Sequence, residues 1–416
     1  MKKNKSSLSR ILFFTEFFAP VQNSTAYYIT KICCTAAKVF DQVHVFCAAS
    51  TDSRAEQSMP ENLIVHRIDS GSGDKNKIIS RILKFCRISI KFTWALFRNA
   101  RSTDTIFAVT NPAFMIPIMA MVKKFIGFKY ILLAYDIFPE NLFAADLLHR
   151  TNLAYKVTKK FFDWGYRSAD SVISIGRDMS EILKQKGVPA NKIILIPNWA
   201  DDQSIKQLPK NGNRLVKQYR LEDKRIFLFA GNFGRVQGIP ELLDVIDHVS
   251  SPDVAFLFVG DGKMRGTIED YLRKHPDKNV FCHPYLPMSE QNTFLNACDI
   301  AIVTLGKNML GLGVPSKSYY SLASGHPIFY IGEQDSEISY VLQEWKCGWQ
   351  ISPGNIAECA KTIDRIAALP QAELDLMSQN AKECLSKHYS EKMILDRYIK
   401  YFGTWSTDHE NSDPRR

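Results

Sequence analysis

Short runs of apolar and β-branched residues recur along the whole chain, and segments with helical periodicity separate most of them. This alternation predicts parallel, doubly wound α/β sheets. This alternation is interrupted by a polar stretch from Asp201 to Arg214 and resumes after it, so we expect two such domains with a cleft between them. A length of 416 residues, 45% of them hydrophobic, suffices for two cores. The predicted strands are ILFF, QVHVFCA, LIVHRI, TIFAV, KYILLAY, SVISI and IILIP, then IFLFAG, VAFLFVG, VFCHPYL, DIAIVTL and HPIFYIG.

The boundaries of these parts follow from the same pattern. We predict a first domain over residues 1–200 and a second over residues 201–385. The pattern is helical beyond Pro370 to about Trp405. The polar tail, residues 406–416, is predicted to be disordered.

The segment GLGVPSKSYYSLASGHPI, from Gly311 to Ile328, has the features of an anion-binding turn. Pro315 suits the first turn of a helix, and Ser316 and Lys317 follow it with a hydroxyl and an ammonium. Helix N-termini carry unpaired N–H groups and a positive partial charge, so they favour anions. Gly313 would let a ligand approach the backbone. The alternative is an ordinary capped helix between two strands.

A second anion-suited turn lies in RIFLFAGNFGRVQGIPELL, which begins at Arg225. It predicts a buried strand, a glycine-bearing turn and a helix, and ligands bind at such strand ends in open parallel sheets. Arg235 offers a forked donor suited to a diphosphate. The spacing fits neither a dinucleotide fingerprint nor a Walker loop.

Five motifs in order carry a family resemblance. The chain resembles the family 4 retaining glycosyltransferases of the GT-B fold, and within them a bacterial branch that builds O-antigen, capsule and exopolysaccharide. The motifs are YDIFPEN (135–141), IPNWAD (196–201), GNFGRVQG (231–238), VGDGKMR (259–265) and VPSK (314–317).

The resemblance implies two Rossmann-like domains and a last helix, residues 386–405, that crosses back to the first domain. It implies transfer of a sugar from a nucleotide diphosphate, here a UDP-sugar, to a lipid-linked saccharide, with retention and without a metal or other cofactor. The turn with Gln22, Asn23 and Ser24 would face the donor phosphates and the acceptor. The implied donor-binding residues are Gly231, Asn232, Gly234, Arg235, Tyr285, Leu286, Gly313, Pro315, Ser316, Lys317 and Tyr320.

Two carboxylates, Asp136 and Glu140, follow the predicted strand KYILLAY. Either could orient an acceptor hydroxyl or take its proton, so both are catalytic candidates. The alternative is a helix cap for Asp136 and a first-turn acid for Glu140.

Tyr320 departs from the family pattern, because many relatives carry a glutamate there that holds the ribose hydroxyls. A tyrosine cannot accept a bidentate pair from a diol. Two alternatives to a transferase therefore stay open: a catalytically degenerate scaffold subunit of a polysaccharide-assembly complex, and a nucleotide-sugar epimerase of the same fold.

The surplus of positively charged residues is confined to the first half of the chain. Residues 1–200 hold 28 Lys and Arg against 15 Asp and Glu, a balance of +13, whereas residues 201–416 hold 25 against 28, or −3. From Lys75 to Arg101 there are eight basic residues and no acidic one. We expect this helix to contact an anionic membrane surface, or else to have a solvated basic face. No nucleic-acid module accompanies the charge, so no nucleic-acid partner is expected. The membrane-facing side chains are predicted to be Lys77, Arg81, Lys84 and Lys91.

Nine cysteines occur without CxxC or CxxH spacing, so we interpret them as reduced thiols of a cytoplasmic protein. The basic start of the chain lacks the apolar core of a signal peptide. The apolar stretch from Ile106 to Val122 contains Pro112 and Pro117 and fits a buried strand and helix better than a membrane span. We expect a cytoplasmic protein, peripheral at the inner face of the cell membrane.

Overall fold

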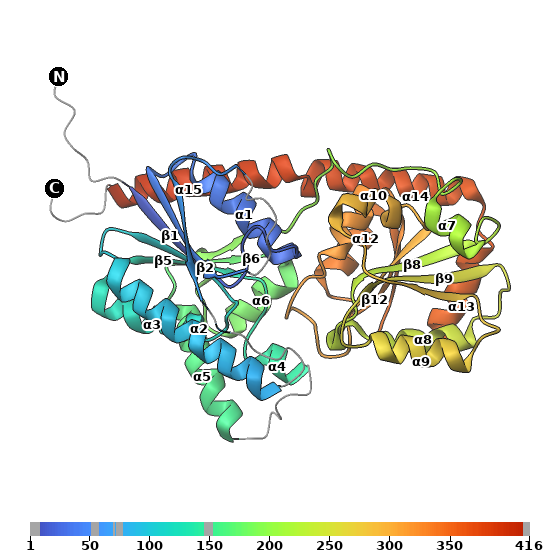
Figure 1. Cartoon of the computed structure of the whole chain (residues 1–416), viewed down its shortest axis with the longest axis horizontal. Coiled ribbons are helices and arrows are strands. Elements are labelled where there is room, and N and C mark those ends of the chain that lie inside the picture. The colour runs from blue at the N-terminus through green and yellow to red at the C-terminus, as the bar shows by residue number, and fades with distance from the viewer. Residues whose placement is uncertain (1–8, 51–57, 70, 72–77, 145–152, 411–416) are drawn as a thin grey trace.

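The computed structural model describes residues 9–50, 58–69, 71, 78–144 and 153–410. It consists of two α/β domains side by side, with the C-terminal helical stretch, residues 371–410, along one edge of both (Figure 1). This is the predicted GT-B architecture of two doubly wound, Rossmann-like domains.

The first domain holds a parallel sheet of seven strands in the order β3-β2-β1-β4-β5-β6-β7. The strands are β1 (Arg10–Thr15), β2 (Gln42–Ala48), β3 (Leu63–Ile68), β4 (Thr105–Val109), β5 (Lys129–Ala134), β6 (Ser171–Ser174) and β7 (Ile193–Leu195). The helices are α1 (Ser24–Ala36), α2 (Ile78–Asn99), α3 (Met115–Ile126), α4 (Glu140–Ala144), α5 (Leu153–Ser168) and α6 (Arg177–Gln185), with a 3₁₀ turn η1 (Ala190–Lys192).

The second domain holds a parallel sheet of six strands in the order β10-β9-β8-β11-β12-β13. The strands are β8 (Arg225–Asn232), β9 (Val254–Asp261), β10 (Val280–His283), β11 (Ile300–Thr304), β12 (Ile328–Ile331) and β13 (Gly348–Ile351). The helices are α7 (Arg214–Tyr219), α8 (Ile239–His248), α9 (Arg265–Lys274), α10 (Gln291–Leu295), α11 (Lys317–Ala323), α12 (Glu337–Trp345), α13 (Ile356–Ala367) and α14 (Gln371–Cys384), with 3₁₀ turns η2 (Arg235–Gln237) and η3 (Met288–Glu290).

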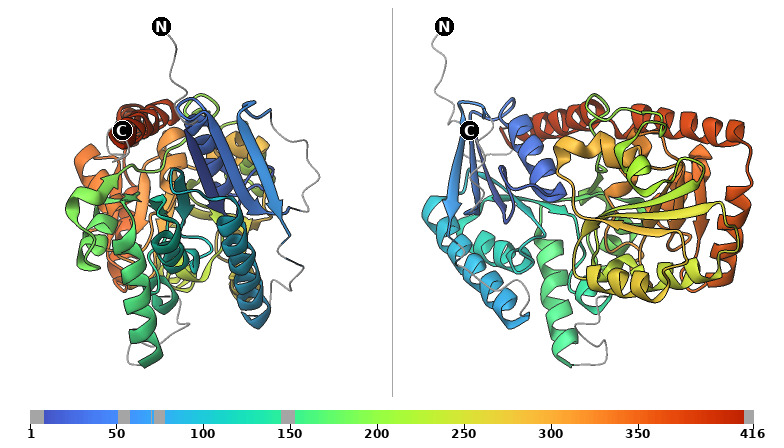
Figure 2. Two further views of the ribbon diagram at one scale, coloured as in Figure 1. Left: turned by 90° about the vertical axis from the view of Figure 1, so that its left-hand side faces the viewer. Right: turned by 45° about the vertical axis from the view of Figure 1, so that its right-hand side comes forward.

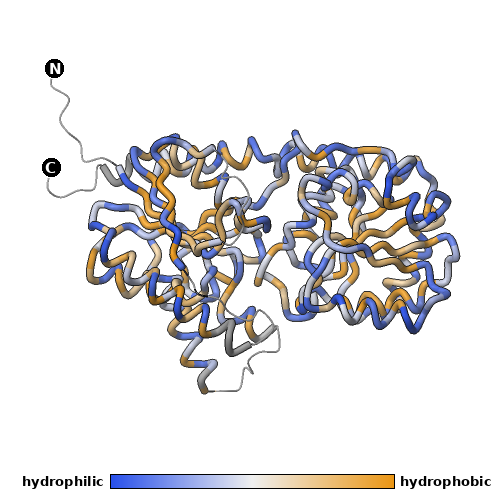
Figure 3. The backbone as a smooth tube through the Cα atoms, in the orientation of Figure 1, coloured by the Kyte–Doolittle hydropathy of each residue, from blue (hydrophilic) through white to orange (hydrophobic). Residues whose placement is uncertain are grey.

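Every predicted strand is present, and the central strands are buried on both faces, as continuous apolar runs require. Hydrophobic residues accordingly concentrate in the two sheets (Figure 3). Strand β13 was not predicted. It is a half-buried edge strand, and its sequence GWQI lacks the apolar run of a central strand.

The C-terminal helix crosses back to the first domain, as predicted. A π-helical turn η4 (Leu385–Tyr389) leads into α15 (Glu391–Glu410), whose residues Ile394, Tyr398 and Phe402 enter the first-domain core. The Lys31 ammonium lies 2.7 Å from the Glu391 carboxylate at the start of this helix. Two expected bounds were wrong: the helix begins at Glu391 instead of residue 386, and it continues past residue 406 to Glu410.

A loop of the second domain is packed into the first. Leu305, Met309 and Leu312 follow β11, yet they are buried in the core of the first domain. The Gly311 amide donates to the Asp178 carboxylate at 3.2 Å. The Arg177 guanidinium pairs at 3.0 Å with Glu337, which is nearly fully buried. These contacts fix the two domains against each other on the side of the predicted cleft.

Candidate functional site

The predicted anion-binding helix α11 starts at Lys317, with Ser316 at the N-cap position and no side-chain capping bond. Pro315 lies one residue before the cap, not in the first helical turn. Its carbonyl accepts hydrogen bonds from the Ser318 amide at 3.2 Å and from the Ser318 hydroxyl at 2.7 Å, which close a tight turn there.

The Lys317 side chain turns back from this helix onto β8. Its ammonium lies 3.6 Å from the centre of the Phe229 ring. The nitrogen is buried and has no hydrogen-bond partner among the described residues. Burial lowers the pKa of Lys317 to about 7. A buried amine of this kind is costly to charge, and an anion beside it would offset that cost.

The glycine turn after β8 lies next to Lys317. Gly231 has φ +116° and Gly238 has φ +59°, conformations that favour glycine. An added Cβ at Gly231 would meet nothing within 4 Å, so space is open on that side. Asn232 and Arg235 are exposed, and Gly234 is the N-cap of η2.

Two residues of this site were not singled out as functional from the sequence. Phe229 supplies the aromatic face under Lys317. The Gln237 side-chain oxygen is buried without a partner among the described residues, and the Gln237 carbonyl accepts a hydrogen bond from Thr304 at the end of β11. Unpaired buried polar atoms are rare in folded proteins and call for an explanation such as a ligand. The contacts of Phe229 with Lys317 and of Gln237 with Thr304 join residues that are far apart in the sequence, and hydrophobic periodicity does not reveal such contacts.

Asp136 meets the same loop from the first domain. It forms an isolated antiparallel bridge with Gly313, and the Ile137 amide donates to the Leu312 carbonyl at 3.1 Å. The Asn141 amide donates to the Asp136 carboxylate at 2.9 Å. Burial raises the pKa of Asp136 to about 6. The structure therefore brings Asp136 and the Gly313–Lys317 segment together, and a carboxylate with this pKa suits a general base.

Glu140 has a different environment. The Lys186 ammonium, almost fully buried, lies 2.7 Å from Glu140 and 2.6 Å from Asp163. Lys159 also pairs with both carboxylates, at 2.7 and 2.9 Å. Burial acts to raise the pKa of Glu140, but these ammonium groups outweigh it and hold the pKa below its usual range. The geometry favours the alternative of a structural acid over a proton acceptor.

Replacing Lys186 with methionine should strongly destabilise the first domain, by about 3–5 kcal/mol, because two partly buried carboxylates lose the more deeply buried of the two ammonium groups that they share. Urea unfolding measures the change. The control is Lys184→Met, since Lys184 is exposed and its pair with Glu181 should contribute little. Equal stabilities of the two variants would contradict a structural role for this cluster.

Tyr320, implied to contact the ribose, points across the domain boundary. Its hydroxyl lies near that of Tyr28 in the first domain, and the Tyr28 hydroxyl itself donates to the Trp199 carbonyl at 2.9 Å. Burial raises the pKa of Tyr320 to about 12, so the phenol is neutral. In this arrangement Tyr320 contacts the first domain, and it does not offer an acceptor for the two ribose hydroxyls.

The remaining implied site residues lie at exposed strand ends. Tyr285 is half exposed after β10, and Leu286 packs under it on the second-domain core. Gln22 and Asn23 are exposed between β1 and α1, and so is Ser24, the first residue of α1. The Asn23 side chain accepts from the Ala26 amide at 2.8 Å, so it caps α1.

Of the four residues predicted to face a membrane, the two whose side chains are described pair with acidic residues of the protein. Lys84 pairs at 3.1 Å with the buried carboxylate of Glu16, and Lys91 pairs at 3.4 Å with Asp69. Lys77 lies outside the described residues, and the side chain of Arg81 is not described. Acidic partners distant in sequence draw Lys84 and Lys91 toward the protein.

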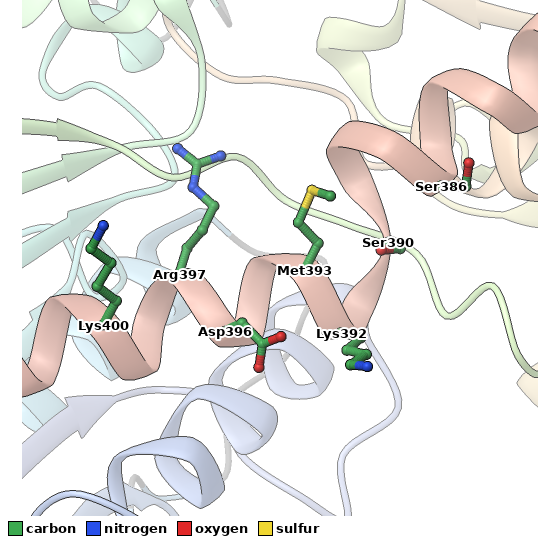
Figure 4. Close-up of a pocket in the computed structure, with 7 residues that line it drawn as sticks. All are labelled: Ser386, Ser390, Lys392, Met393, Asp396, Arg397 and Lys400. Carbon is green, nitrogen blue, oxygen red and sulfur yellow. The ribbon is translucent and has the colours of Figure 1, made fainter.

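Two grooves elsewhere do not coincide with this site. One of about 500 Å³ runs along the start of α15 (Figure 4), where the Arg397 guanidinium donates to the Leu195 carbonyl at 2.6 Å. Another of about 370 Å³ lies beside Lys210 and His326. Among the described residues, no three His, Cys, Asp or Glu side chains gather as a metal site requires. That no cofactor is needed stays a prediction.

Comparisons with known proteins bear on this site. Residues 26–204 match the model of Glycosyltransferase Family 4, and residues 213–383 match that of Glycosyl transferases group 1. The chain is 33% identical to the probable glycosyltransferase WbjE of Pseudomonas aeruginosa, over 94% of this chain and 97% of that protein. It is 22% identical to the putative colanic acid biosynthesis glycosyl transferase WcaI of Escherichia coli K12, over 77% and 79%.

Solved structures agree on the fold. Anabaena HepE in complex with UDP-glucose superposes with a TM-score of 0.68 at 15% identity, over 95% of this chain and 99% of that one. The motifs, the fold and a relative that matches over nearly its whole length agree: the chain belongs to the group 1, family 4 glycosyltransferases and is an enzyme of the GT-B fold.

Proposed function

We propose that this glycosyltransferase moves a sugar from UDP to a lipid-linked saccharide at the cytoplasmic face of a bacterial membrane, with retention of configuration, during cell-surface polysaccharide synthesis. The observation that carries the donor part is the buried, unpaired ammonium of Lys317 beside the open glycine turn of β8. The printed names of WbjE and WcaI support the glycosyl transfer and, for WcaI, polysaccharide synthesis, and HepE was solved with UDP-glucose. Retention and the lipid-linked acceptor rest on the family resemblance.

The residues divide the chemistry between the domains. In the second domain, Lys317, Arg235 and the amides from Gly231 to Gly234 would stabilise the charge that develops on the leaving diphosphate. In the first domain, Asp136 would orient the acceptor hydroxyl and take its proton. The bridge between Asp136 and Gly313 supports this division, because Gly313 lies four residues before Lys317 in the same segment.

A panel of UDP, GDP, CMP and dTDP tests the donor. A nucleotide that binds only the folded protein raises its melting temperature, and a large excess over Kd stabilises by about 3–4 kcal/mol. We expect a shift with UDP. A melting-temperature shift with another nucleotide of the panel but not with UDP would overturn the choice of UDP. No shift with any would favour the scaffold subunit, for which the contact of Tyr320 with Tyr28 is the specific argument. An epimerase would convert free UDP-sugar without an acceptor, so product analysis separates it.

The low pKa of Lys317 predicts that UDP binding takes up a proton. Above about pH 7 the free amine is neutral, and the diphosphate favours the ammonium, so the affinity should fall as pH rises from 7 to 9, by up to about tenfold per pH unit. Calorimetry in buffers of different ionisation enthalpy counts the protons. Uridine, which lacks the diphosphate, is the control and should bind without proton uptake. A binding heat at pH 8 that is the same in all buffers, which means that no proton is taken up, would contradict this role of Lys317.

A further inference from the structure

Three helices on one side of the first domain expose apolar side chains to solvent. Helix α3 packs between α2 and α5, and the three extend from the same side of the sheet (Figures 1 and 2). The opposite side carries α1 and α15 and is away from this surface. We call the outward side of α2, α3 and α5 the three-helix face.

Helix α2 is apolar on both its inner and its outer side. Ile88, Phe92 and Leu96 are buried against the sheet. The outward stripe recurs every three or four residues, the spacing of one helix face, and apart from Arg87 it is apolar. Its apolar members are Leu83 (60% exposed), Ile90 (69%), Trp94 (62%) and Phe97 (52%).

The neighbouring helices continue this surface. Met121 and Phe125 project from α3, with Phe114 just before it, and Phe125 is 77% exposed. On α5, Leu153, Val157 and Phe161 follow one another at intervals of four residues and are all exposed. Monomeric soluble proteins rarely leave so many large apolar side chains on one face, and such a face marks an interaction site.

The charge on this face has one sign. Arg87, Arg98, Lys124, Lys156 and Lys160 are exposed on the three helices. Within the bounds of α2, α3 and α5 the only acidic residue is Asp163, which pairs with Lys186 and Lys159. The Arg98 guanidinium lies 5.0 Å from the Trp94 ring, and the Lys124 ammonium lies 5.0 Å from the Trp164 ring. Aromatic rings beside cations suit the boundary between lipid tails and headgroups.

We propose that the three-helix face docks on an anionic lipid bilayer, with the apolar side chains inserted between headgroups and the surrounding Arg and Lys on lipid phosphates. Charge complementarity favours lipid over a second copy of this chain, because the same basic face would repel itself. No helix within the described residues is long and apolar enough to cross a membrane. The inference rests on the proposed lipid-linked acceptor in one respect: α4 begins four residues after Asp136, and its Glu140 pairs with Lys159 of α5, so the Asp136 turn is joined to one helix of the docked face.

Apolar insertion is the property to test. One variant combines Ile90→Ser, Phe125→Ser and Val157→Ser, one substitution per helix. The matched control combines Leu208→Ser, Leu376→Ser and Met393→Ser, which are exposed apolar residues elsewhere. Both are compared with the wild type for co-sedimentation with vesicles of mixed phosphatidylglycerol and phosphatidylcholine, and of phosphatidylcholine alone. Brominated lipid reports insertion of Trp94 through quenching of its fluorescence, with Trp94→Phe as reference.

We expect the wild type and the control variant to bind the mixed vesicles, and the three-helix variant to bind them more than about tenfold more weakly. All three proteins should bind vesicles of phosphatidylcholine alone less than mixed vesicles. Equal binding by both triple variants would overturn the inference, as would a wild type that binds no vesicle. A wild type that self-associates without lipid, with a monomeric three-helix variant, would identify a copy–copy interface and also overturn it. The UDP-induced melting shift is recorded for each protein: its absence in a wild type that binds vesicles would count against the proposed function alone.

Discussion

Replacing Lys317 with methionine should raise the melting temperature of the free protein and greatly reduce its stabilisation by UDP. In the unfolded chain this lysine is charged below about pH 10.4, whereas burial lowers its folded pKa to about 7. The fold therefore opposes the charge, which costs a few kcal/mol at neutral pH, roughly 1.4 kcal/mol per pKa unit. Methionine fills similar space over Phe229 without that cost. Binding loses the charge-assisted contact to the diphosphate, about 1.5–3 kcal/mol.

Thermal melting with and without UDP measures both effects in one experiment. Lys274→Met is the control, because Lys274 is exposed at the end of α9 and should change neither quantity. A methionine variant that melts lower than the wild type would show that the ammonium has a structural partner. A variant that keeps the UDP shift would remove Lys317 from the donor site.

Replacing Asp136 with asparagine should lower donor turnover by about 10²–10⁴-fold and leave UDP affinity unchanged, because a general base contributes on that scale. Burial raises the pKa of Asp136 to about 6, so wild-type turnover should fall as the pH drops below 6 and the carboxylate takes up a proton. Release of the nucleotide diphosphate follows the reaction. The asparagine variant should lose this acid limb of its pH profile.

Glu140→Gln is the matched control for Asp136→Asn. Its carboxylate pairs with Lys159 and Lys186, so the variant should lose stability while folded enzyme keeps its turnover. A turnover loss in Glu140→Gln as large as that in Asp136→Asn would reverse the roles assigned to these two carboxylates.

The sequence was sufficient for the fold because its strands are buried on both faces and therefore appear as continuous apolar runs. The edge strand β13, Gly348–Ile351, has no such run and was missed. The placement of Lys317 and of Asp136, each beyond the end of a strand in its own domain, was also accessible, since ligands bind at the carboxyl ends of the strands in open parallel sheets. Their actual contacts were not, because Gly313 belongs to a loop that packs into the other domain.

Assignments that depended on charge partners were the least accessible. Glu140 looked free, but its partners Lys159 and Lys186 follow 19 and 46 residues later. The basic residues of α2 looked like an outer face, but Lys84 turns toward Glu16, 68 residues before it. Periodicity reports which residues share a face, whereas the direction of that face depends on tertiary packing.

The loop after β11 limits how chimeric enzymes can be assembled from this family. Leu305, Met309 and Leu312 come from the second domain but complete the core of the first. A second domain transplanted from a relative would bring foreign side chains into that core, with the cost of a cavity or an overlap. A chimera should therefore keep residues 305–314 and helix α15 with the first domain. The transplanted second domain then consists of two discontinuous segments and not of a single stretch cut near residue 200.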